Sequence, residues 1–136
     1  MASIQSGIQT GKNDSVSFGN YEVTEKIKAK LEIAGDEYYV KTHNEITKLE
    51  KNGMLLIETV PGAAIFDFSV EENIVSFFAE GKGNTDTQIT LELLPNCDYS
   101  LVIDGETIGT VKTNRSGKAA FSIELSSEQK SVTLKK

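Results

Sequence analysis

Histidine and cysteine, which often serve as base and nucleophile in covalent catalysis, each occur once among the 136 residues. A serine nucleophile needs a base to accept its proton, and His43 is the only histidine for that role. It lies in residues 42–45, where the alternation of apolar and polar side chains stops, which indicates a surface loop. Cys97 stands between Asn96 and Asp98, which offer no positive charge to stabilise a thiolate. We therefore predict that the chain has no catalytic residue and is not an enzyme.

Carboxylates are abundant, but their spacing does not define a site. With 20 acidic residues, many pairs could reach the separation that glycoside hydrolysis requires, so a single pair predicts nothing. Residues 71–73 and 84–86 offer oxygen atoms to calcium, although neither has the alternation of an EF-hand loop. Residues 81–84 are rich in glycine but lack the helix that would hold a phosphate. We predict no metal site and no cofactor.

Two pairs of adjacent aromatic residues are the candidates for ligand binding. Sugar-binding β-sandwiches usually present exposed aromatic rings, and the absence of tryptophan here counts against that function. Adjacent side chains of a strand point to opposite faces, so one ring of Tyr38 and Tyr39, and one of Phe77 and Phe78, must leave the main core. Either another layer or a neighbouring domain covers these rings, or they form a binding platform.

The elements that position these rings are predicted to be strands. In residues 26–33 apolar and charged residues alternate, and Gly35 then allows a tight reversal, so residues 26–41 are expected to form a hairpin. The turn signals Asp104-Gly105 and residues 114–117 divide residues 98–125 into a three-stranded meander. Further strands are expected over residues 54–60, 64–70, 74–80, 88–93 and 131–135, with a strand or one helical turn over 46–51. About nine or ten short strands at this spacing predict an all-β, antiparallel two-sheet β-sandwich.

The side-chain pattern also predicts which faces are buried. Phe66, Phe68 and Val70 share one parity and are expected to face the core, with Asp67 pointing to solvent. The continuous apolar run over residues 54–57 predicts a central strand that is covered on both faces.

Length and charge restrict the organisation and the partners. The chain has the length of one domain, and its net charge of −6, with basic residues interleaved among acidic ones, argues against nucleic acid. No apolar run of about 18 residues is present, so membrane insertion is not expected. Residues 1–20 are rich in Ser, Gly, Asn and Gln and are predicted to be a flexible linker or a cloning remnant. Residues 21–136 are predicted to form the sandwich.

Two long runs resemble a known family. YYVKTHNEITKLEKNGMLLIETVPGAAIFDFSV and TQITLELLPNCDYSLVIDGETIGTVKTNRSGKAAFSIEL are similar to the β-rich C-terminal region of secreted bacterial heparinase II/III-like polysaccharide lyases. In that family the catalytic Tyr, His and Arg lie largely in a helical toroid and an adjoining β-sandwich. None of them matches His43 or a tyrosine of this chain, so no catalytic role is carried over. The resemblance implies an extracellular, carbohydrate-related accessory role.

Three functions remain open at this point. The first is a non-catalytic accessory module of a larger secreted bacterial polysaccharide-active protein, which packs against or positions an adjacent domain. The second is an independent carbohydrate-binding or adhesion module, with Tyr38, Tyr39, Phe77 and Phe78 as its contacts. The third is a fragment that contributes His43 to a composite lyase or hydrolase site.

Overall fold

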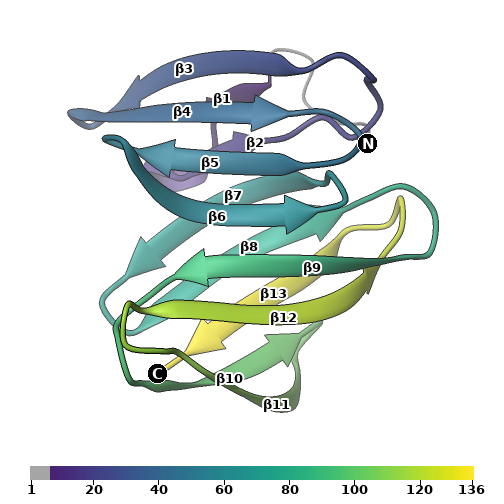
Figure 1. Cartoon of the computed structure of the whole chain (residues 1–136). Coiled ribbons are helices and arrows are strands. Elements are labelled where there is room, and N and C mark those ends of the chain that lie inside the picture. Colours follow the sequence, from purple (N-terminus) through teal and green to yellow (C-terminus); the bar gives the residue numbers. More distant parts are fainter. Residues whose placement is uncertain (1–6) are drawn as a thin grey trace.

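A computed structural model describes residues 7–136 and shows two antiparallel sheets packed face to face (Figure 1). Thirteen strands are present in this part of the chain, together with one short 3-10 turn, η1 (Lys12–Asp14). The strands are β1 (Ile8–Thr10), β2 (Val16–Phe18), β3 (Ile27–Ile33), β4 (Asp36–Thr42), β5 (Thr47–Lys51), β6 (Met54–Val60), β7 (Ala64–Glu71), β8 (Ile74–Glu80), β9 (Thr85–Glu92), β10 (Asp98–Ile103), β11 (Glu106–Lys112), β12 (Lys118–Leu125) and β13 (Lys130–Lys135). The predicted all-β sandwich is confirmed, with more strands than the nine or ten expected.

The chain passes several times from one sheet to the other. One sheet has seven strands in the order β1-β2-β7-β8-β13-β10-β11, and the other has six in the order β12-β9-β6-β5-β4-β3. In Figure 1 the six-stranded sheet lies in front, from β3 at the top to β12 below. The meander β3 to β6 is local, whereas β9, β12 and β13 each pair with strands distant in sequence. No helix in the described residues could span a bilayer.

The N-terminal segment is part of the sandwich and is not a linker over residues 7–20. Its strand β2 pairs with β7 in the seven-stranded sheet, and Val16 and Phe18 are fully enclosed in the core. Residues 1–6 of the predicted linker lie outside the described residues. The prediction was wrong because the strands here are only three residues long, too short to display a period of two.

The core lies between the inner faces of the two sheets. Phe68 is its aromatic centre, since its ring lies 6.0 Å from that of Phe18 in an edge-to-face contact and 5.7 Å from that of Phe77. The facing sheet contributes aliphatic side chains such as Leu49 and Ile57, which are both fully buried. Rings from one layer and branched aliphatic chains from the other fill the space between the sheets.

A β-bulge in β7 changes the predicted orientation of its side chains. The register of β7 against β8 shifts between Phe66 and Ser69, and Asp67 there has a positive φ of 53°. An extra residue in one strand breaks the period of two, so the side chains of Phe66 and Phe68 point to opposite faces of the sheet. Phe68 enters the core as predicted, whereas Phe66 packs in a separate cluster with Tyr21 and Ala64. Val70, also expected in the core, is 51% exposed at the strand end.

The second cluster covers a buried carboxylate on the outer side of the seven-stranded sheet. Glu80 has no exposed surface, and its Oε2 accepts a hydrogen bond of 2.9 Å from the hydroxyl of Tyr21. Its Oε1 accepts a longer bond of 3.4 Å from the side-chain amide of Gln129. Because a buried carboxylate needs such donors, Tyr21 attaches the segment after β2 to the sheet.

The strand β6 is central in its sheet but is not covered on both faces as predicted. It lies between β5 and β9, yet Met54 and Val60 at its two ends are 72% and 50% exposed. The register against β5 shifts between Leu49 and Glu50, where β6 carries the extra residue Leu56, so Leu56 and Ile57 both contact the core. A bulge lets consecutive apolar residues approach the same face, which a sequence pattern cannot distinguish from two-sided burial.

Replacing Phe68 by alanine should lower the free energy of unfolding by about 3 to 5 kcal/mol, because it removes buried surface and leaves a cavity next to two rings. Chemical denaturation of the purified chain measures this loss. Val70→Ala is the matched control and should cost less than about 1 kcal/mol because its side chain is half exposed. A loss below 1 kcal/mol for Phe68→Ala would contradict the assignment of this ring to the core.

Tyr21→Phe should lower the unfolding free energy by about 1.5 to 3 kcal/mol, because the buried carboxylate of Glu80 loses a hydrogen-bond donor. Tyr39→Phe, at a half-exposed position on the other sheet, should change stability by no more than about 0.5 kcal/mol. Equal effects of the two changes in urea denaturation would show that the Tyr21 bond is not important for stability.

Candidate functional site

Each predicted aromatic pair divides between two environments. Phe77 is 2% exposed in the core, whereas Phe78 is 42% exposed on the outer side of the seven-stranded sheet. Tyr38 packs half-buried against the edge of the core, and Tyr39 is half-buried with its ring near two lysines of its own sheet. One ring of each pair leaves the core, as the alternation predicts. Phe77 is thereby excluded as a ligand contact, because the core encloses its ring.

Tyr39 lies in a positively charged part of the six-stranded sheet. The Nζ atoms of Lys30 and Lys41 lie 5.9 and 6.0 Å from the centre of its ring, within the range of a cation–π contact. Lys41 stands directly opposite Lys28 on one side and Lys48 on the other. Lysine side chains therefore already occupy the surroundings of Tyr39.

Tyr38 and Phe78 line two neighbouring hollows that the sequence did not predict. The hollows have volumes of about 270 and 300 Å³, and Asn13, Ser69 and Glu71 line both of them. Tyr38 lines the first hollow and Phe78 the second, so we call the pair of hollows the Tyr38–Phe78 groove. Its remaining lining residues are Asp14, Ser15, Lys51, Leu56, Asp67, Phe68, Val70 and Ser76.

The β7 bulge positions a carboxylate in the Phe78 hollow of this groove. The backbone N–H of Asp67 donates a hydrogen bond of 2.9 Å to Oγ of Ser17, and the hydroxyl of Ser15 lies 3.4 Å from the Asp67 carboxylate. A Cβ atom on Gly11 would stand 2.4 Å from that carboxylate oxygen and 2.5 Å from the Ser15 hydroxyl, so a side chain at position 11 would displace both groups. Asn13 has a positive φ of 54°, like that of Asp67 at 53°. Such backbone conformations often occur at functional sites.

Charged groups hold the Tyr38 end of the groove in place. The side-chain amide of Asn52 donates a hydrogen bond of 3.0 Å to Asp36, and Lys51 lies 3.5 Å from the same carboxylate. The bond from Asn52, with a smaller contribution from the charge of Lys51, lowers the pKa of Asp36 below its ordinary value. The Lys51 ammonium also lies 6.0 Å from the centre of the Tyr38 ring. The hairpin turns of β3-β4 and β5-β6 are thus tied together beside the groove.

The two residues with intrinsic reactivity lie outside this groove. Nδ1 of His43 is 3.2 Å from the side-chain oxygen of its neighbour Asn44, in the turn that the sequence predicted. Cys97 is half-buried in the loop after β9, and its thiol donates a hydrogen bond of 3.3 Å to the carbonyl of Pro95. Within residues 7–136 no group of three or more His, Cys, Asp or Glu side chains could hold a metal ion.

Sequence reasoning missed the residues that build the groove walls. Asn13, Asp14 and Ser15 belong to the segment that was expected to be a linker, and Glu71 was considered only for calcium. The one available signal was Gly11, because a glycine in a polar segment can mark a close approach of other groups. Pairing of β2 with β7 brings this segment next to Asp67, about fifty positions further along the chain.

Comparison of the chain with protein-family models, with curated proteins and with solved structures finds no match. The geometry of the groove is therefore the basis on which a function can be argued.

Asn52→Gly should raise the pKa of Asp36 toward its ordinary value, because it removes the donor and keeps a residue that tolerates the positive φ of position 52. A carboxyl NMR titration measures this pKa in each variant. Lys51→Ala should raise the pKa of Asp36 less than Asn52→Gly does, because the charge of Lys51 contributes less to the shift. A lowered pKa stabilises the folded state above the pKa of the unfolded chain, and this contribution is lost as the pH falls through the folded pKa. An unchanged Asp36 pKa in Asn52→Gly would contradict the assigned cause.

Proposed function

We propose that this chain is a non-catalytic accessory module of a larger secreted bacterial polysaccharide-active protein, and that it binds polysaccharide in the Tyr38–Phe78 groove. The observation that supports the proposal most strongly is the exposed ring of Phe78, 42% accessible beside a groove lined by hydroxyl, amide and carboxylate groups. Aromatic rings present a flat apolar face to the C–H groups of a sugar, and polar groups around them fix its orientation.

The groove suits a sugar chain better than an apolar ligand. Ser15, Ser69 and Ser76 present hydroxyl groups, and the carboxylates of Asp67 and Glu71 can accept hydrogen bonds from sugar hydroxyls. Its two hollows share three lining residues and each contains one aromatic residue, so neighbouring sugar units of a chain could occupy them. Asp67 is held by the bulge before a ligand arrives, which reduces the ordering that binding requires.

Tyr39 was an equally good candidate in the sequence but is less suited in the structure. Lys30 and Lys41 lie near its ring, and a neutral sugar would have to displace them. We therefore assign ligand contact to Phe78 and Tyr38, and we use Tyr39 as the control position.

A glycan array, run with and without added calcium, identifies a ligand, and titration calorimetry then measures its affinity. Phe78→Ala should weaken binding about tenfold or more, as truncation of a central aromatic contact does. Asp67→Asn should also weaken binding because the carboxylate loses its charge. Tyr39→Ala should leave the affinity unchanged, and circular dichroism confirms that each variant keeps its fold.

Absence of binding to every glycan on the array would contradict polysaccharide binding and would favour a purely structural role next to a partner domain. Stronger loss of binding in Tyr39→Ala than in Phe78→Ala would place the site on the six-stranded sheet instead of in the groove.

A further inference from the structure

A second hollow, separate in chemistry from the groove, lies where the β7-β8 turn meets the loop after β9. Its volume is about 490 Å³, and its walls are mainly apolar, with Val70, Ile74, Leu93 and Leu94 among the lining residues. Leu94 and Val70 remain 42% and 51% exposed there. A hollow of this size and polarity can receive one or two apolar side chains, whereas it offers few partners to sugar hydroxyls.

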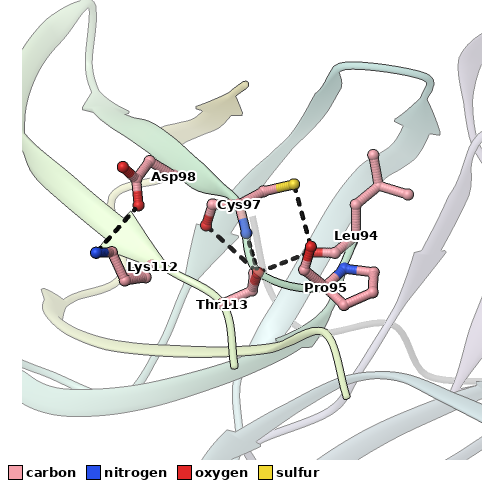
Figure 2. A network of polar contacts seen from close by, with 6 residues as sticks. All are labelled: Leu94, Pro95, Cys97, Asp98, Lys112 and Thr113. Atoms are coloured by element: carbon pink, nitrogen blue, oxygen red, sulfur yellow. Dashed lines mark hydrogen bonds and ion pairs between the residues drawn. The ribbon is translucent and has the colours of Figure 1, made fainter. Parts of the chain in front are cut away.

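The backbone that carries Leu94 is fixed by hydrogen bonds on both sides (Figure 2). The hydroxyl of Thr113 donates a bond of 2.7 Å to the carbonyl of Leu94, and the backbone N–H of Cys97 donates one of 2.8 Å to that hydroxyl. The backbone N–H of Leu94 itself donates to the hydroxyl of Tyr99 at 3.2 Å. In Figure 2 the Leu94 side chain projects away from these bonds. The backbone that presents the exposed leucine is thus held in place.

The rim of the hollow is negatively charged. Glu71, Glu72 and Glu92 line it together with the apolar residues. None of the described lining residues is basic, and the lysines beside them in the strand register are Lys118, opposite Glu92, and Lys135, opposite Ile74. Three carboxylates around an apolar surface favour an occupant that combines an apolar group with positive charge and disfavour an acidic one.

We infer that this hollow docks a polypeptide segment of a partner domain in which an apolar side chain stands next to lysine or arginine. The apolar side chain contacts Leu94 and Ile74, and the basic residues lie beside Glu72 and Glu92. Because the backbone at Leu94 is already held by hydrogen bonds, its contact with the partner costs little backbone entropy. This inference rests on the proposed role as an accessory module, which would be joined to its parent protein at this end. The hollow borders the groove, since Val70 and Glu71 line both, whereas Leu94, Ile74, Glu72 and Glu92 belong to the hollow alone.

Three matched peptides test this inference on the full 136-residue chain. Each has leucine and isoleucine at alternate positions, with lysine, serine or glutamate between them, and each is titrated while backbone amide NMR signals are recorded. The lysine peptide should shift the amide signals of Val70, Ile74 and Leu94, and its binding should weaken as salt is added. The serine peptide should bind more weakly and the glutamate peptide should not bind.

Two variants locate the contact. Leu94→Ser should weaken binding of the lysine peptide at least about fivefold, and Glu72→Lys should abolish the preference for lysine over glutamate. Ile108→Ser, which changes a residue 53% exposed on β11, is the control and should bind like the unchanged chain. Failure of all three peptides to bind at millimolar concentration, or equal binding of the lysine and glutamate peptides, would overturn the inference.

Discussion

The rings of Phe18, Phe68 and Phe77 pack together between the sheets, and the surface features of this protein follow from that contact. Phe68 can reach both neighbours only because the bulge in β7 rotates it inward while Phe66 remains outward. Burial of these rings stabilises the seven-stranded sheet, since large aromatic side chains dominate the energetics of a core. The β1-β2 segment is held to that sheet by the same burial, through Phe18.

The bulge connects core packing to the groove. An extra residue in a strand leaves one position outside the regular ladder, and in β7 this position is Asp67, whose backbone N–H bonds to Ser17 instead. Asp67 consequently lines the same hollow as Phe78. The feature that lets Phe68 fill the core thus also provides the groove with a polar group, so core and groove cannot be changed independently at this point of β7.

The two ends of the sandwich differ in how much apolar surface they expose. At one end, the side-chain amide of Asn52 in the β5-β6 turn donates a hydrogen bond to Asp36 at the start of β4, so polar contacts join the two turns. At the end of β9 the loop is tied equally well through Thr113, yet Leu94 is left exposed beside Val70. Exposed apolar side chains that gather in a hollow differ from scattered ones, because a contiguous apolar surface usually has a partner. The polar groove and the apolar hollow therefore differ in chemistry, although Val70 and Glu71 line both.

The alternation of apolar and charged residues determined the class of fold and most strand positions, because side chains of a strand point alternately to two faces and only one face is buried. The hairpin over residues 26–41 and the meander over residues 98–125 were predictable for this reason, since their turns and partners are local. Only the tertiary structure decided that residues 7–20 belong to the sandwich and that Phe66 lies outside the main core. It also decided that Tyr38 and Phe78 line neighbouring hollows. Each of these depends on contacts between segments far apart in the chain, and a bulge adds no residue type that a local pattern could detect.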